Sequence, residues 1–287
     1  MRTSVLAAAA AAALLLAGCS GAATSAPASS GGAASSGGAA AAPAGLVTSG
    51  KFTLCIDPEY APLEYFENGS SGNIVGFDAD AARALAKHWG VETKFEVSAF
   101  DGLMPALQAK RCDAIFGGLY MTETRLGVAD AAALMKTGPS ILTSPARQKD
   151  FTKPTDLCGV SVAAQSASAN AAKIKSLASD CQAAGKPAPK LAEYPKTAET
   201  VLAVINGKAD ALIETDVAAA YMASQNEGKL VIAKGVFAPD TKFGVFSRKG
   251  DKLSPAIADG IKALRADGTL AKIAEQYKLD QSTVTVD

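Results

Sequence analysis

A short apolar run, a glycine pair and a lone arginine follow one another in Asp113-Ala-Ile-Phe-Gly-Gly-Leu-Tyr-Met-Thr-Glu-Thr-Arg125. Residues 114–116 are short enough for a buried strand, and the glycines after them let the backbone approach another group. Thr122 has the hydroxyl that caps a helix beginning after it. Arg125 then lies in the first helical turn, where the helix dipole disfavours a cation. We therefore interpret its guanidinium as a bidentate donor for a carboxylate; pairing with a neighbouring acid at the surface is the alternative.

Composition restricts the class of protein. The chain has 287 residues, 48% of them hydrophobic and 20% charged, and its formal net charge is zero. This size suits one or two globular domains, and the balanced charge does not show the excess of basic residues typical of nucleic-acid-binding proteins. The single histidine, His88, lies at the end of an expected helix, so we interpret it as structural. No metal-ligand spacing and no dinucleotide or phosphate-binding glycine motif is present, so we expect no metal and no cofactor.

The beginning of the chain has the features of an exported lipoprotein. Met1-Arg2 is followed by an apolar stretch over residues 5–17, too short for a stable membrane span, and then by Leu16-Ala-Gly-Cys19. This motif resembles a bacterial lipobox, which implies a signal peptide over residues 1–19 and a lipidated Cys19; a plain secretory signal is the alternative. Residues 20–45 contain only Ala, Gly, Ser, Thr and Pro, which predicts a disordered tether. We expect the folded part outside the cytoplasm, anchored to the outer face of the cell membrane.

Strands and helices alternate along the part that begins near Leu46. Expected strands at residues 52–56, 91–97 and 114–116 are separated by helices that begin near Asp78 and Phe100. This order predicts a parallel sheet with helices on its faces, and ligands of such sheets lie beyond the carboxyl ends of the strands. A similar order recurs from residue 159 onward. The sequence therefore predicts two lobes of similar build, whose strand ends face one another across a cleft.

Four cysteines follow the lipobox: Cys55, Cys112, Cys158 and Cys181. An exported protein folds in an oxidising compartment, which favours disulfides. Four cysteines allow three pairings. Pairing within each lobe would join Cys55 to Cys112 and Cys158 to Cys181, and each closed loop would contribute about 3 to 4 kcal/mol on an entropic model. Four buried thiols are the alternative.

Six motifs occur in order along the folded part: Asp57-Pro-Glu-Tyr-Ala-Pro62, Gly76-Phe-Asp-Ala-Asp80, Phe100-Asp-Gly-Leu-Met-Pro-Ala-Leu107, Cys112-Asp-Ala-Ile115, Met121-Thr-Glu-Thr-Arg125 and Gly159-Val-Ser-Val-Ala-Ala-Gln-Ser-Ala-Ser168. Together they resemble the family 3 solute-binding proteins of amino-acid ABC transporters. The resemblance implies two Rossmann-like α/β lobes joined by a two-strand hinge, the type II periplasmic binding protein architecture. Lobe one would comprise residues 46–143 and 241–287, and lobe two residues 144–240. The crossings would fall near residues 141–144 and before Gly244.

The resemblance also implies a role for each matched residue. Arg125 would hold the α-carboxylate of the ligand through two parallel hydrogen bonds. Ser168 lies at an expected helix start, which also favours an anion. Tyr60 and Phe100 would flank the aliphatic part of the ligand, and the Gly118 carbonyl would accept from its α-ammonium.

Three positions depart from the family pattern. The acid that pairs with the α-ammonium falls on Thr215, whose hydroxyl does not neutralise a cation. Tyr120 stands where the family often has Ser or Thr, and Ala167 replaces a glycine. The acids available as substitutes are Glu214, Asp57 and Asp216. Otherwise the ligand lacks an ammonium group and is a different carboxylate.

We expect a monomeric binding protein without a catalytic step. It would capture a small carboxylate-bearing solute, most simply an amino acid, and deliver it to an ABC permease with a cytoplasmic ATPase. One alternative is an enzyme on the same fold, similar to cyclohexadienyl dehydratases, with Glu214 as general acid and Glu64 as a second candidate. Another is a ligand-sensing partner of a membrane receptor.

Overall fold

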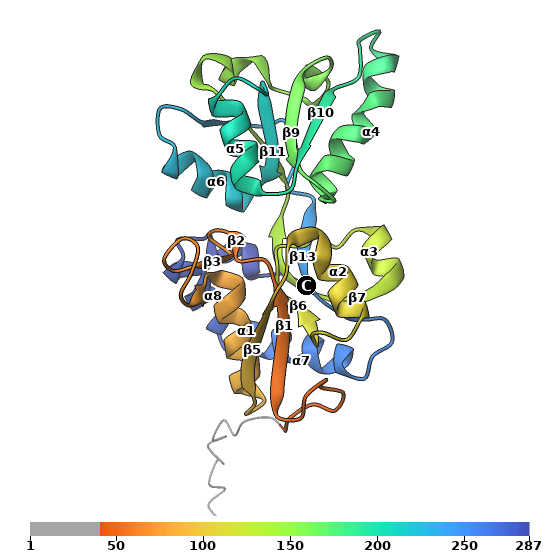
Figure 1. Cartoon of the computed structure of the whole chain (residues 1–287), viewed down its shortest axis with the longest axis vertical. Coiled ribbons are helices and arrows are strands. Elements are labelled where there is room, and N and C mark those ends of the chain that lie inside the picture. The colour runs from red at the N-terminus through yellow and green to blue at the C-terminus, as the bar shows by residue number, and fades with distance from the viewer. Residues whose placement is uncertain (1–40, 287) are drawn as a thin grey trace, which may run out of the picture. The chain divides into compact units, whose positions relative to one another are not determined.

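Two five-stranded mixed sheets organise the folded part of the chain, one in each lobe (Figure 1). The computed structural model describes residues 41–286, which belong to one compact unit. The expected signal peptide, the lipidated Cys19 and most of the expected tether lie outside the described residues. Within residues 41–286, no helix has both the length and the apolar character needed to cross a bilayer.

The first sheet has the strand order β5-β1-β6-β13-β7. Its strands are β1 (Lys51–Ile56), β5 (Glu92–Val97), β6 (Ala114–Ile115), β7 (Ala129–Thr137) and β13 (Thr241–Arg248). Strand β1 pairs in parallel with β5 and β6, as the sequence predicts. Strand β13 is antiparallel to both β6 and β7, so the sheet is mixed rather than parallel throughout.

Helices cover both faces of the first sheet. One face carries α1 (Phe77–His88), α7 (Leu253–Ala266) and α8 (Thr269–Gln276); the other carries α2 (Leu103–Gln108) and α3 (Glu123–Val128). Alternate residues of β1 face these two layers, since Leu54 packs with α1 and Cys55 packs with α2. The C-terminal helices therefore complete the core of lobe one.

The second sheet has the order β10-β9-β11-β8-β12. Its strands are β8 (Pro139–Thr143), β9 (Ser161–Gln165), β10 (Lys190–Tyr194), β11 (Ala211–Thr215) and β12 (Val231–Ala233). Helix α4 (Ala169–Ala183) packs on one face, and α5 (Thr197–Ile205) and α6 (Asp216–Gln225) on the other. Strands β9, β10 and β11 run in parallel, so the second lobe repeats the local order of the first.

Smaller elements fill the connections. Strands β2 (Glu59–Tyr60), β3 (Glu64–Phe66) and β4 (Ile74–Val75) form a three-stranded antiparallel sheet in lobe one. Short 3-10 turns occur at Phe100–Gly102, Pro145–Asp150, Pro154–Leu157 and Gln281–Val284.

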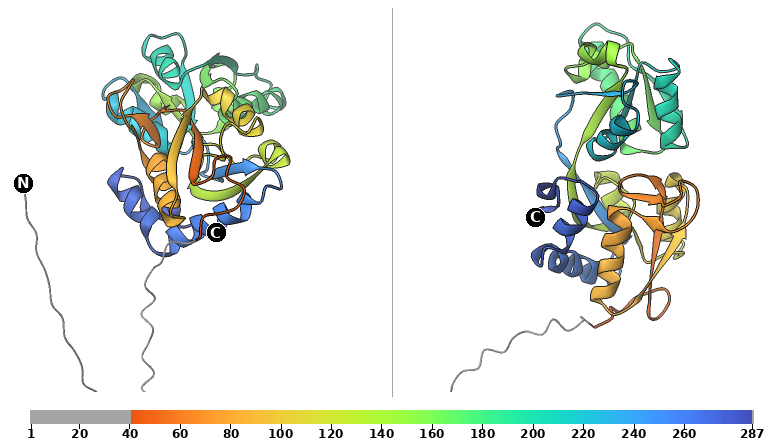
Figure 2. Two further views of the ribbon diagram at one scale, coloured as in Figure 1. Left: turned by 60° about the horizontal axis from the view of Figure 1, so that its bottom comes forward. Right: turned by 90° about the vertical axis from the view of Figure 1, so that its left-hand side faces the viewer.

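Two segments join the lobes and lie against each other (Figure 2). Strand β7 ends in the first sheet and β8 begins in the second, with only Gly138 between them. A Cβ at Gly138 would overlap the backbone of Pro239, which precedes β13, so glycine allows the two segments to touch. The expected boundary after residue 143 is therefore wrong. Strand β8 pairs with β11 and β12, which places residues 139–143 in lobe two.

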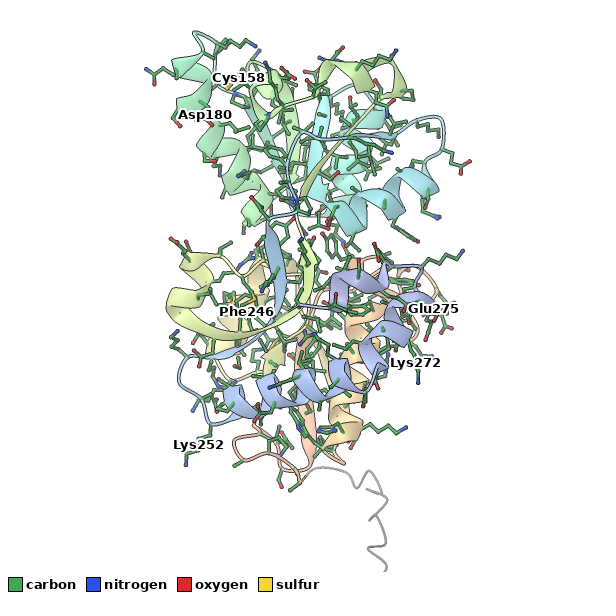
Figure 3. The ribbon with its side chains drawn as sticks, turned by 180° about the vertical axis from the view of Figure 1, so that it is seen from behind. Cys158, Asp180, Phe246, Lys252, Lys272 and Glu275 are labelled. Carbon is green, nitrogen blue, oxygen red and sulfur yellow. A yellow bond between two sulfur atoms is a disulfide. The ribbon has the colours of Figure 1, made fainter. Side chains whose placement is uncertain are left out.

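The disulfides join Cys55 to Cys112 and Cys158 to Cys181, which confirms the pairing within each lobe. Figure 3 shows Cys158 in the second lobe and Phe246 in the first, where Phe246 packs in the same core cluster as the Cys55–Cys112 bridge. Helix α1 begins near Asp78 as expected, with Gly76 at its N-cap. Asp78 is buried in the first turn.

Candidate functional site

A cavity lies at the carboxyl ends of the parallel strands of both sheets, where the topology places a ligand. Lobe one contributes residues that follow β1, β5 and β6, and lobe two contributes the ends of β9 and β11 with the helix starts after them. The lining residues are Tyr60, Phe100, Gly118, Tyr120, Arg125, Gln165, Ser168, Ala169, Asn170, Glu214 and Thr215.

Arg125 supplies the positive charge of this cavity. The Thr122 side chain caps α3 by accepting a hydrogen bond from the Arg125 backbone N at 3.3 Å, as predicted. Arg125 Nη1 donates to the Tyr120 carbonyl at 3.0 Å, and the guanidinium lies 5.8 Å from the ring centroid of Phe100. Burial lowers the pKa of Arg125 to about 10, so the side chain stays protonated at neutral pH. No carboxylate within residues 41–286 forms an ion pair with it.

Glu214 supplies the negative charge. Its side chain is buried, and Oε1 accepts hydrogen bonds from Tyr60 Oη at 2.7 Å and from the Thr215 backbone N at 2.8 Å. The Tyr60 hydroxyl also lies 2.7 Å from Thr215 Oγ1, so one tyrosine from lobe one contacts two residues of lobe two. Burial raises the pKa of Glu214 to about 7. Among the described residues, Glu214 Oε2 has no hydrogen-bond partner.

Gly118 is required by its position against Tyr60. Its φ of +58° lies in the left-handed region, and a Cβ there would meet Tyr60 Cε1 at 2.7 Å. The Gly118 backbone N donates to Asp78 Oδ2 at 3.0 Å. Asp78 thus fixes the loop after β6 from behind the cavity, even though burial raises the pKa of its carboxyl to about 7.

Polar side chains without partners lie at Tyr120 and Asn170. The Tyr120 ring stacks on Phe243 with centroids 5.4 Å apart, and so packs against the protein. Its hydroxyl is buried and has no hydrogen-bond partner among the described residues, and the same holds for Asn170 Oδ1. Gln165, also buried, donates from Nε2 to the Pro195 carbonyl at 3.3 Å.

The start of α4 presents a capped helix terminus to the cavity. Ser168 Oγ accepts from the Ala171 backbone N at 3.0 Å, as the sequence predicts for an N-cap. The residue before it, Ala167, has a φ of +60°, a conformation that costs an L-residue with a Cβ about 1 to 2 kcal/mol. Replacing the family's glycine by alanine therefore leaves the backbone in the geometry that glycine prefers.

Ala167→Gly should raise the free energy of unfolding by about 0.5 to 1 kcal/mol. The left-handed strain is removed, and the greater freedom of glycine in the unfolded chain offsets part of the gain. Urea unfolding of both proteins measures the difference. Ala184→Gly, at the negative-φ C-cap of the same helix, is the control and should not stabilise. A destabilised Ala167→Gly protein would contradict the assignment of strain.

The structure brings together the residues expected at the ligand, except for the two candidate acids Asp57 and Asp216. Asp57 lies outside the cavity lining, beside Glu59 and Lys196, and burial raises its pKa to about 6. Asp216, the other candidate acid, also lies outside the lining. Its Oδ1 accepts from Thr137 Oγ1 at 2.6 Å and from the Val217 backbone N at 2.9 Å. Of the expected substitutes for the family's acid, only Glu214 lines the cavity.

Sequence reasoning missed Gln165 and Asn170. The available signals were a polar residue ending a parallel strand and an amide in the first turn of the next helix. Metal binding has no support in the part of the chain that the structure describes, since no group of three or more His, Cys, Asp or Glu side chains is placed to hold an ion.

Comparison with known proteins agrees with this architecture. Residues 52–280 match the family model of bacterial extracellular solute-binding proteins, family 3. The arginine-binding protein ArgT of Corynebacterium glutamicum is 26% identical over 240 residues, covering 83% of this chain and 78% of its own. The amino acid ABC transporter substrate-binding protein AbpA of Streptococcus pneumoniae, solved with L-arginine, superposes with a TM-score of 0.71. It is 25% identical, covering 83% of this chain and 97% of its own.

A second similar structure relates to the enzyme alternative. It is an ancestral amino acid-binding protein described as a precursor of cyclohexadienyl dehydratase. Its TM-score is 0.67 at 28% identity, with 79% of this chain and 95% of its own covered. The two lobes, the cavity at their strand ends and the family match over most of the folded part agree: this chain belongs to the family 3 bacterial extracellular solute-binding proteins.

Proposed function

We propose that this protein captures an amino acid between its lobes and delivers it to an ABC importer. One observation carries the proposal: a guanidinium without a carboxylate partner and a buried carboxylate line the same cavity. An amino acid is the small zwitterion that complements these two charges. The family match and the amino acid-binding relatives support the same class of ligand.

Each end of the zwitterion has a candidate partner. Arg125 would bind the α-carboxylate through two parallel N–H donors of its planar guanidinium. The capped helix start at Ser168, in the opposite lobe, favours the same anion. Tyr60 and Phe100 would flank the aliphatic carbons. Residues of both lobes would then touch one ligand, which is what selects the bound conformation of a two-lobed protein.

Glu214 would hold the α-ammonium in place of the family's aspartate. Asp57 and Asp216 lie outside the lining, and Thr215 already shares its hydroxyl with Tyr60. Glu214 Oε1 is occupied by two donors, whereas Oε2 has no partner among the described residues. The Gly118 carbonyl would be a second acceptor for the ammonium.

The partners of this protein follow from the family. A membrane permease with a cytoplasmic ATPase would receive the amino acid, and the folded part would act as a monomer outside the cytoplasm. The lipobox-like motif supports a lipid anchor at Cys19. A sensing partner of a membrane receptor would use the same site. Deletion of an adjacent permease gene would separate the two roles, because it should abolish uptake of the amino acid only if the role is transport.

A thermal-shift screen of the twenty standard L-amino acids tests the proposal. A ligand present at 100 times its dissociation constant stabilises the folded protein by about 2.7 kcal/mol. At least one amino acid should therefore raise the melting temperature, while a matched set of amines and alcohols without a carboxylate should not. Absence of any shift, confirmed by calorimetry, would overturn the proposal.

Catalysis on the same fold has one observation in its favour. Glu214 has a pKa near neutrality and lines the cavity, as a general acid would, and one similar structure is a dehydratase precursor. We infer that binding, not turnover, is the activity, because the binding-protein relatives span most of the chain. Incubation with cyclohexadienyl carboxylic acids should leave them unchanged by mass spectrometry, and measurable dehydration would contradict this.

The affinity should depend on pH through Glu214. A ligand ammonium pairs with the ionised carboxylate, so the dissociation constant should rise by up to about tenfold per pH unit as the pH falls below about 7. Above that pH the affinity should level off. Glu214→Gln removes the charge and should weaken binding about tenfold at pH 8, with a flat profile between pH 5.5 and 8. A variant that keeps the pH profile of the original protein would exclude Glu214 as its source.

A further inference from the structure

The cavity lining has no charged residue that could pair with the side chain of a bound amino acid. Arg125 is the one basic residue of the lining and Glu214 the one acidic residue. If these hold the α-carboxylate and the α-ammonium, a third charge on the ligand would be buried without a partner, which is costly. Cationic and anionic side chains are therefore both disfavoured.

Two buried polar atoms of the lining lack hydrogen bonds. Tyr120 is 6% exposed and Asn170 is 5% exposed. Neither the Tyr120 hydroxyl nor Asn170 Oδ1 has a partner among the described residues, although both residues line the cavity. The side chains of Asn170 and Thr137 lie close to the Tyr120 hydroxyl but are not hydrogen-bonded to it. Buried polar atoms of folded proteins nearly always find a partner, so an apolar ligand would leave these two unsatisfied.

Among the described residues, the two acids next to the cavity are not part of its lining. Asp216 lies outside the lining and already accepts from Thr137, and Asp57 lies outside it beside Lys196. The buried amide of Gln165 adds another neutral polar group to the second-lobe wall. Apart from Glu214, the polar side chains of that wall are hydroxyls and amides.

We propose that the amino acid bound here has an uncharged polar side chain with both a hydrogen-bond donor and an acceptor, of which a carboxamide is the simplest. Tyr120 and Asn170 would form hydrogen bonds with this side chain. The Tyr120 hydroxyl donates or accepts, and the Asn170 amide offers one acceptor and two donors. The inference rests on the proposed function and narrows its ligand. It separates this chain from ArgT, which is named as an arginine-binding protein, and from AbpA, which was solved with L-arginine.

Calorimetry at pH 8 with four probes tests the inference. L-Glutamine should bind at least tenfold more tightly than L-arginine, L-glutamate or L-norleucine, which test positive, negative and apolar side chains of similar length. Tighter binding of any of these three would overturn the inference and leave the proposed function standing. Failure of all twenty standard amino acids to bind would overturn the proposed function and this inference with it.

Two pairs of variants test the residues themselves. Asn170→Asp adds a carboxylate at the start of α4, where the helix dipole favours it, and should raise the arginine-to-glutamine affinity ratio at least tenfold. Asn206→Asp, exposed at the end of α5, adds the same charge away from the cavity and should not change the ratio. An unchanged ratio in a folded Asn170→Asp protein would remove Asn170 from ligand recognition.

Tyr120→Phe removes one hydroxyl and keeps the stacking on Phe243. Glutamine affinity should fall about fivefold to tenfold, while norleucine affinity should stay constant or rise. Tyr221→Phe, outside this cavity, is the matched control. Equal losses for glutamine and norleucine would show that Tyr120 acts by packing alone and would overturn its proposed role.

Discussion

Arg125→Ala should lower the affinity for the bound amino acid at least about 30-fold, the largest binding effect that we expect from a single substitution. Loss of one partner from a buried charge pair costs about 2 to 5 kcal/mol, and each 1.4 kcal/mol is a factor of ten. The guanidinium is the one cation lining the cavity, so no other side chain there would replace it. Calorimetry with the ligand from the amino-acid screen measures the loss.

Two further variants isolate the cause. Arg125→Lys keeps the charge but loses the two parallel donors, so its affinity should lie between those of the original protein and Arg125→Ala. Arg111→Ala removes an exposed guanidinium of the same lobe that pairs with Glu96, and it should leave the affinity unchanged. A folded Arg125→Ala protein with unaltered affinity would eliminate the assigned carboxylate site.

Local patterns were sufficient to predict most of the fold. Apolar runs of strand length, and hydroxyls such as Thr122 and Ser168 before helical segments, each have a local physical cause and appear in the structure. The path between the lobes has no local cause. The chain passes from β7 in the first sheet to β8 in the second at Gly138, which packs against Pro239, a residue about a hundred positions away in the chain. A pattern over a few residues carries no information about such a contact.

The site was predictable where topology alone places a residue. Residues that follow parallel strands meet at one edge, so Phe100, Arg125 and Glu214 line one cavity. Asp57 was misplaced because its position just after β1 does not fix the direction of its side chain. Asn170 was missed because an amide in a first helical turn has many uses, and only its burial without a partner distinguishes it.

Glu64→Met should stabilise the protein increasingly as the pH rises. Glu64 is fully buried in β3, and neither carboxylate oxygen has a hydrogen-bond partner among the described residues. Burial raises its pKa well above the usual 4.5, and the nearby carboxyl of Asp78 raises it further. Above about pH 4.5 the unfolded chain releases this proton while the folded protein retains it. The folded protein therefore loses about 1.4 kcal/mol of stability per pH unit through this group until its own pKa is reached.

The variant lacks this proton, so its advantage over the original protein should grow as the pH rises from 5 to 7, by at most about 1.4 kcal/mol per pH unit. Urea unfolding at pH 5, 6 and 7 measures the difference. Glu64→Gln keeps the shape of the side chain and should remove the same pH dependence. It serves as the second variant in case methionine packs poorly at this position. Glu67→Gln changes an exposed acid in the next turn and should leave the profile as it was. Parallel stability profiles for Glu64→Met, Glu64→Gln and the original protein would mean that Glu64 is ionised in the folded state. A cation or ordered water would then have to compensate a carboxylate that has no protein partner within residues 41–286.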